Sequence, residues 1–169
     1  MKHLFILVLC VSVFSCKQNK ENNTFVVDEK LQKELQEQFI LVEDGGTIEL
    51  PEGNYKFSKS LSMEGKKNIT IKGKGVDKTI FSFLGQIEGA EGMNFSNCNA
   101  ITLENFTIQD AKGDNIKLKG CTDVVIRHMN STWTTGADSA NGNYGYYPVE
   151  CRKVLIENSE VSHCADAGA

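Results

Sequence analysis

Acidic side chains and one histidine recur in the second half of the chain, where they could carry out acid–base chemistry. The candidate catalytic residues are Asp110, Asp114, Asp166 and His163. Glycoside hydrolysis needs one protonated and one ionised carboxyl group, whereas a lyase or epimerase needs a base beside the sugar carbon. The same aspartates could hold Ca²⁺, which prefers oxygen ligands. Their spacing is not diagnostic, because an Asp beside Gly in a turn commonly hydrogen-bonds its own backbone.

An aromatic and polar segment between positions 133 and 147 could bind a sugar. It contains the only tryptophan and three of the four tyrosines of the chain. Sugar rings stack their C–H faces on aromatic rings, and their hydroxyls need polar partners. The candidate substrate-binding residues are Trp133, Asp138, Asn141, Tyr144, Tyr146 and Tyr147. The alternative is a long turn whose aromatic side chains pack against one another and bind no ligand.

These residues must be positioned by a repeated element that begins at Cys98, Cys121 and Cys151. After each cysteine, two aliphatic residues follow at a spacing of two, and an Asn or His ends the passage. The aliphatic pairs are Ile101/Leu103, Val124/Ile126 and Val154/Ile156. A period of two indicates a strand, and a strand that returns with every repeat indicates a solenoid. The sequence therefore predicts an all-β parallel β-helix.

Stacking the repeats predicts columns of equivalent residues. One column contains Glu104, Arg127 and Glu157, and its alternating charges predict a row of ion pairs on the solvent face. The residues at the twelfth position after each cysteine are Asp110, Trp133 and His163, which should share one corner. The cysteines could form a free, buried column, or they could form disulfides in an oxidising compartment. Zinc is not indicated, because there is no CxxC pair.

The N-terminal part has the features of an exported lipoprotein. Residues 1–15 predict a signal peptide, because a basic start precedes a short apolar run. Cys16 is the predicted lipidation site, and an ordinary signal peptide is the alternative. Residues 16–27 form a tether, 28–43 a short amphipathic helix that caps the solenoid, and 44–169 the β-helix coils. The net charge of −4 argues against nucleic acid as a partner, and we expect a monomer.

Several Gly- and Asp-rich turns carry a resemblance to a known group. The segment Gly-Gly-Thr-Ile-Glu-Leu-Pro-Glu-Gly at 45–53 resembles the start of bacterial right-handed parallel β-helix repeat proteins, and 71–75, 113–116, 133–136, 141–149 and 165–168 fit the same group. The group is broadly similar to the pectin-lyase-like superfamily, which includes polysaccharide lyases, hydrolases, uronate epimerases and copper-site assembly proteins. The resemblance implies a right-handed winding and further coils beyond residue 169.

Together these features predict a lipid-anchored protein of the bacterial cell envelope, in the outer membrane or periplasm. Its expected partner is a polysaccharide, which it binds and could also process as a lyase, epimerase or hydrolase. The alternative is a non-catalytic envelope scaffold or an accessory protein for metal-site assembly.

Overall fold

The computed structural model describes residues 26–169. The predicted signal peptide, Cys16 and most of the predicted tether lie outside the described residues. Among the helices of residues 26–169, none is both long and apolar enough to cross a membrane.

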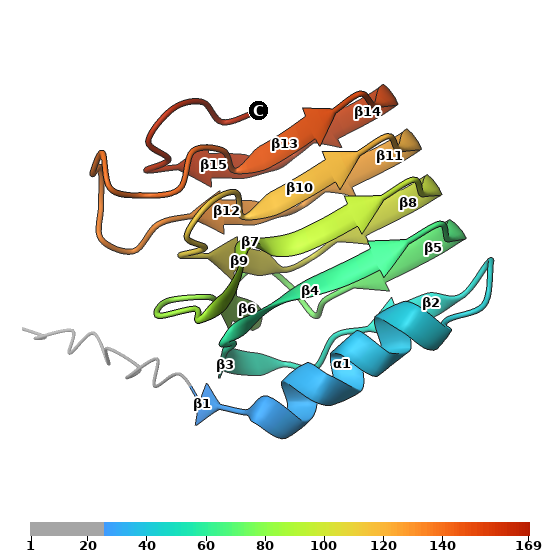
Figure 1. The fold of residues 1–169 in the computed structure, drawn as a ribbon, viewed down its shortest axis with the longest axis horizontal. Helices are drawn as coiled ribbons and strands as arrows, with labels where there is room; N and C mark the ends of the chain where they lie inside the picture. The colour runs from blue at the N-terminus through green and yellow to red at the C-terminus, as the bar shows by residue number, and fades with distance from the viewer. Residues whose placement is uncertain (1–25) are drawn as a thin grey trace, which may run out of the picture.

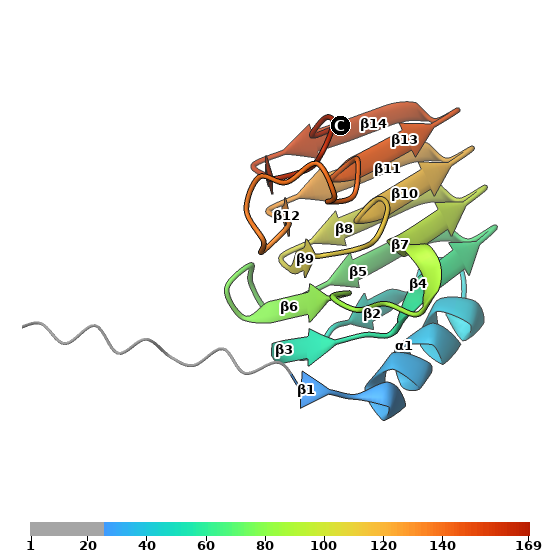
Figure 2. The ribbon, with the colours of Figure 1, turned by 60° about the vertical axis from the view of Figure 1, so that its left-hand side comes forward.

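The described chain winds through three parallel sheets (Figure 1). Sheet A contains β1 (Val26–Val27), β3 (Gly53–Lys56), β6 (Thr79–Ser82), β9 (Thr107–Gln109), β12 (Asn130–Thr132) and β15 (Glu160–Ser162). Sheet B contains β2 (Thr47–Glu49), β5 (Lys67–Lys72), β8 (Asn99–Glu104), β11 (Thr122–Arg127) and β14 (Arg152–Glu157). Sheet C contains β4 (Lys59–Glu64), β7 (Glu88–Ser96), β10 (Ile116–Lys119) and β13 (Tyr146–Val149). The predicted parallel β-helix is confirmed, and Figures 1 and 2 show that its coils wind in the right-handed sense.

The inward side chains of successive coils lie directly above one another. In sheet B, Ile126 faces Leu103 on one side and Ile156 on the other, as the repeat spacing predicts. Phenylalanines form a second stack, in which Phe57 and Phe81 have ring centroids 4.8 Å apart. Each fully buried side chain of this size contributes roughly 1.5–3 kcal/mol. A coil cannot bury this surface alone, so neighbouring coils hold one another in register.

The corners of the solenoid use the left-handed backbone conformation. Asn105, His128 and Asn158 have φ of 62°, 51° and 48° at the corner that follows sheet B. Asn and His enter this region more readily than most side chains, which explains why they end each repeat. The backbone N–H of Asn105 donates to the carbonyl of His128 at 3.1 Å, so the corners are also linked along the stack.

The cysteines form an unbridged column at the opposite end of sheet B, between sheets C and B. Cys98 and Cys121 are buried, and the cysteines of the described residues are free. The Cys121 thiol donates to the carbonyl of Phe95 at 3.5 Å. A hydrogen bond from Cys121 lowers the pKa of Cys98 to about 7, and the same bond raises the pKa of Cys121. Cys98 is therefore the thiol of the pair that ionises more readily.

The predicted ion-pair row is longer than the repeats alone indicate. Strand register places Glu49, Lys72, Glu104, Arg127 and Glu157 in one column of alternating sign. Glu104 accepts from Arg127 Nε at 2.7 Å and lies 3.6 Å from Lys72 Nζ. Arg127 thus serves to pair a largely buried carboxylate.

Helix α1 (Glu29–Leu41) covers the first coil, as predicted for the capping helix. Asp28 caps it by accepting from the backbone N–H of Leu31 at 2.8 Å. Leu35 and Phe39 pack into the core. Figure 1 shows α1 lying along β4, the edge strand of sheet C. The helix therefore shields both the apolar end of the solenoid and an otherwise unpaired strand edge.

Candidate functional site

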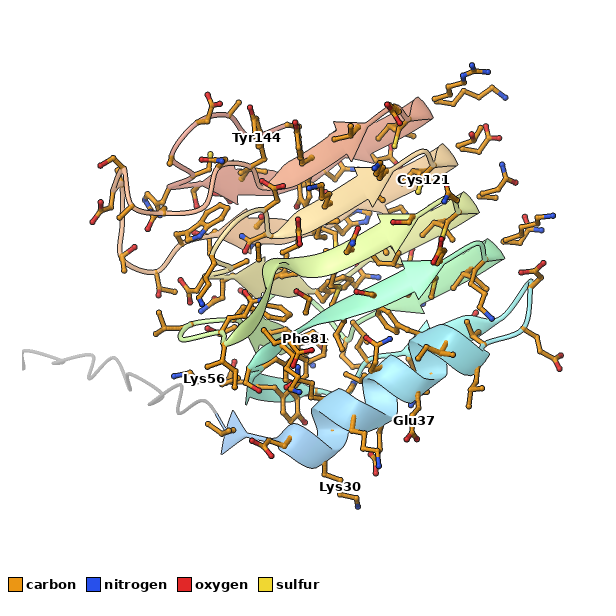
Figure 3. All side chains as sticks on the ribbon, in the orientation of Figure 1. Lys30, Glu37, Lys56, Phe81, Cys121 and Tyr144 are labelled. Carbon is orange, nitrogen blue, oxygen red and sulfur yellow. The ribbon has the colours of Figure 1, made fainter. Side chains whose placement is uncertain are left out.

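The outer face of sheet C gathers aromatic, acidic and basic side chains from three coils. Strand register places Asn94 of β7, Lys117 of β10 and Tyr147 of β13 in one column. Lys117 points outward because its neighbours Ile116 and Leu118 are fully buried. Figure 3 shows Tyr144 at the start of β13, at the end of sheet C that lies away from Cys121.

Tyr144 and Tyr147 form a parallel ring pair, which we call the tyrosine platform. Their centroids lie 4.4 Å apart, and their planes differ by 7°. Lys117 Nζ lies 5.7 Å from the centroid of Tyr147. The Tyr144 hydroxyl donates to Asp166 Oδ2 at 2.8 Å, which fixes the ring and raises the pKa of Tyr144. The platform is therefore held in place before any ligand arrives.

Two carboxyl groups beside the platform have opposite electrostatic environments. Burial raises the pKa of Asp114, against the opposing charge of Lys117, and the negative charge of Glu91 adds to the increase. Burial also acts to raise the pKa of Glu91, but the hydrogen bond and positive charge of Lys117, together with backbone hydrogen bonds, outweigh burial, so the pKa of Glu91 is lowered. Lys117 Nζ lies 3.0 Å from Glu91 Oε1. Asp114 is therefore the carboxyl that takes a proton more readily, while Glu91 stays ionised.

Asp110 has a different environment from Asp114, with all its hydrogen bonds directed into the protein. Its Oδ1 accepts from the backbone N–H and the hydroxyl of Thr134, at 2.7 and 2.9 Å. Its Oδ2 accepts from Ser82 Oγ at 2.9 Å and Gln109 Nε2 at 3.0 Å. These contacts tie sheet A to the loop that follows Trp133. The geometry gives Asp110 a clear role in holding the coils together.

Trp133 and Tyr146 of the aromatic segment lie in the interior, with 3% and 1% of their surface exposed. Trp133 Nε1 donates to the carbonyl of Ala111 at 2.9 Å. Burial raises the pKa of Tyr146, whose hydroxyl donates to the carbonyl of Glu160 at 3.4 Å. The two side chains support the loop from within, because strand alternation turns Tyr146 inward and Tyr147 outward.

The other predicted site residues organise the long loop between β12 and β13. Asp138 Oδ1 accepts from the N–H of Ala140 at 2.9 Å. Asn141 Nδ2 donates to the carbonyls of Gly136 and His163, both at 2.7 Å. The His163 ring lies 3.5 Å from the Thr132 hydroxyl. The structure thus brings Asp114, Asp166, Tyr144 and Tyr147 together, and it uses the other predicted residues to build the loop and corner.

Sequence reasoning missed Glu91 and Lys117. The available signal was the alternation Ile116-Lys117-Leu118-Lys119, which is typical of a half-buried strand with its lysines outward. Glu91 had no such signal, because it reaches the platform through its pairing with Lys117 on the next coil. Contacts between coils depend on register, which the local pattern does not give.

The Ca²⁺ site that the sequence suggested at the aspartates stays a prediction. Both Asp110 oxygens are already occupied by protein donors. Within residues 26–169, no group of three or more His, Cys, Asp or Glu side chains is arranged to hold a metal ion.

No protein-family model matches the sequence, and no curated protein matches it. Among solved structures, the fold is similar to that of a "putative glycosyl hydrolase" from Parabacteroides merdae, with 16% sequence identity and a TM-score of 0.42. The match covers 74% of this chain and 77% of that one. A similarity this low does not extend the activity of that protein to this chain.

Proposed function

We propose that this protein binds a carbohydrate chain on the outer face of sheet C, with the tyrosine platform at its centre. The observation that carries the proposal is the parallel pair of rings, 4.4 Å apart, beside the Glu91–Lys117 ion pair. The C–H face of a sugar ring packs on aromatic carbon, and its hydroxyls hydrogen-bond to charged neighbours. Glu91, Asp114 and Lys117 supply such neighbours.

The rigidity of the platform supports this function. Asp166 holds Tyr144, and Tyr147 contacts both Tyr144 and Lys117. The backbone of β13 is paired along its length with β10. A site whose side chains are already ordered loses less conformational entropy on binding.

A glycan array tests the proposal, with Tyr147→Ala beside the unchanged protein. The matched control is Tyr55→Ala, since Tyr55 is a half-buried tyrosine of sheet A, remote from the platform. We expect Tyr147→Ala to lose binding by at least about tenfold, or 1.4 kcal/mol, and the control to retain it. Equal binding by both variants would place the glycan elsewhere. If the folded, unchanged protein binds neither neutral nor acidic glycans, the result would favour the role of a non-catalytic scaffold or a metal-site accessory protein.

A second candidate function, hydrolysis of the bound glycan, is favoured by the opposite pKa changes of Asp114 and Glu91. In such a reaction the glycosidic C–O bond breaks, and Asp114 gives its proton to the leaving oxygen. Water adds to the anomeric carbon, and its proton passes to the ionised Glu91. Release of reducing ends measures turnover. Asp114→Asn should abolish that release while the glycan still binds, and release that survives the substitution would exclude this role for Asp114.

Location in the cell envelope is a separate part of the proposal. It depends on residues 1–16, which lie outside the described part of the chain, and on the lipid-anchor motif at Cys16. Partitioning of the expressed protein into detergent, compared with Cys16→Ser, tests the anchor. Several acyl chains on one cysteine would anchor the protein stably in detergent. Cys16→Ser removes the site of these chains, so this variant should move to the aqueous phase.

A further inference from the structure

A trough runs along the flank of α1, where the helix meets the outer face of sheet C. It consists of three adjoining depressions of about 430, 440 and 470 Å³, and Gln36 lines all of them. Ser62 belongs to two of the depressions, and Lys59 and Ser60 are likewise shared by two. Figure 1 shows the arrangement, with α1 along the foot of sheet C and β7, β10 and β13 stacked above β4.

The trough is linked to the tyrosine platform through the Glu91–Lys117 ion pair. The depression of about 470 Å³ is lined by Glu91 and Asn94 of β7, and Glu91 is the partner of Lys117. Register also places Ser62, Asn94, Lys117 and Tyr147 in one outward column from the trough to the platform. Four neighbouring strands span about 14 Å, close to the length of about three hexose units.

One polar atom in the trough lacks a partner. Asn94 Oδ1 is buried and accepts no hydrogen bond within residues 26–169. An unsatisfied buried acceptor costs about 1–3 kcal/mol, so a donor that reached Asn94 would recover part of that cost. Sugar hydroxyls are donors of the required kind.

The charges of the trough select against acidic sugars. Its lining contains three lysines and five glutamates. Each lysine is already engaged: Lys33 by Glu37 at 3.8 Å, Lys59 by Glu88 at 2.7 Å, and Lys66 by the carbonyl of Val42 at 2.8 Å. A uronate carboxylate would therefore meet surplus negative charge and no uncommitted lysine in the trough. Like-charge contacts of this kind reject wrong partners.

We propose that the platform and trough together bind a neutral polysaccharide of three or more hexose units and reject polyuronates. This inference rests on the proposed function, because the platform anchors one end of the chain. Affinity should therefore increase with chain length as sugars fill the trough.

Calorimetric titration of the full chain tests the inference with neutral oligosaccharides of glucose, mannose and galactose, from disaccharide to hexasaccharide, and with oligogalacturonates of the same lengths. We expect at least one neutral series to gain tenfold or more in affinity with length, and the oligogalacturonates to bind more weakly. Asn94→Ala should remove much of the length dependence. The control, Lys119→Ala, changes an exposed outward residue of the same sheet that does not line the trough, and it should leave the length dependence unchanged.

A charge variant tests the selectivity directly. Glu88→Gln releases Lys59 from its ion pair and should increase oligogalacturonate affinity several-fold. The inference fails, while the proposed function stands, if Tyr147→Ala abolishes a binding that is independent of length or that prefers uronates. Both fail if the folded protein binds no member of either series.

Discussion

The side chain of Gln36 on α1 forms two hydrogen bonds with the backbone of Ser62 on β4. Gln36 Nε2 donates to the Ser62 carbonyl at 2.9 Å, and the Ser62 N–H donates to Gln36 Oε1 at 2.8 Å. Gln32, one turn earlier, does the same with the carbonyl of Lys59 at 2.6 Å and the N–H of Ser58 at 3.1 Å. Two glutamines at a spacing of four thus take the place of a neighbouring strand.

Removing this pairing should destabilise the fold by an amount that depends on burial. Gln36→Ala should reduce the free energy of unfolding by about 1 kcal/mol, because water can reach the released groups. Gln32→Ala should cost about 2–3 kcal/mol. Gln32 is buried, so the backbone groups that it pairs with would be left without a hydrogen-bond partner and without water. Urea unfolding measures both, and the exposed Gln38→Ala is the matched control on the same helix. Equal losses for all three variants would contradict the edge-pairing role.

The left-handed backbone at Ala100, near the start of β8, predicts a stabilising substitution. Ala100 has φ of 54°, a region that costs a residue with a Cβ about 1–2 kcal/mol. Ala100→Gly should therefore stabilise the chain by about 0.5–1 kcal/mol, after the larger backbone entropy of glycine in the unfolded state is subtracted.

The reverse substitution at another left-handed position serves as the control for this backbone strain. Gly65 has φ of 68°, and an added Cβ would meet nothing within 4 Å. Gly65→Ala should cost about 1 kcal/mol through backbone strain alone. Urea unfolding should move in opposite directions for the two variants, and a loss of stability in Ala100→Gly would show that the strain is absent.

Substitution of Asp114 should have a pH-dependent effect on stability. Burial raises its pKa in the folded state, so the folded chain binds this proton more tightly than the unfolded chain. That contribution is present below the unfolded pKa and is lost as the pH rises through the folded pKa. Asp114→Asn should therefore stabilise the chain at neutral pH, and the gain should shrink as the pH falls toward the ordinary value of 3.8. Unfolding measured over a pH series would contradict this if the gain were constant or absent.

We expect Trp133 to stabilise the fold and not to contact the ligand. Its side chain is buried, so Trp133→Ala should cost about 3–5 kcal/mol. Trp133→Phe should cost less and should keep glycan binding, because Tyr144 and Tyr147 remain in place. Unfolding and glycan titration of the Phe variant separate the two roles. A folded Trp133→Phe protein that no longer binds any glycan bound by the unchanged chain would assign Trp133 to the site.

Much of the fold follows from local sequence patterns. The spacing of Ile101 and Leu103, repeated at Val124 and Ile126, gives strands with one buried face, because side chains alternate along a strand. The same spacing places Cys98 beside Cys121 and Glu104 beside Arg127 without knowledge of the turns. The capping helix was equally predictable, since Leu31, Leu35 and Phe39 recur at the helical period and Asp28 precedes them.

The candidate site depended on tertiary structure because it is built across coils. Trp133, Tyr146 and Tyr147 are all aromatic and could all bind a sugar by residue type. Only the tertiary structure shows that Trp133 and Tyr146 point inward. Asp110 and Asp114 are both acidic and close in sequence, yet four protein donors surround Asp110, whereas Asp114 is influenced by burial and by the charges of Lys117 and Glu91. The sequence by itself determined a parallel β-helix, because its repeat is local. Only the stacked coils decided which polar side chains meet, because burial and charge pairing depend on residues far apart in the chain.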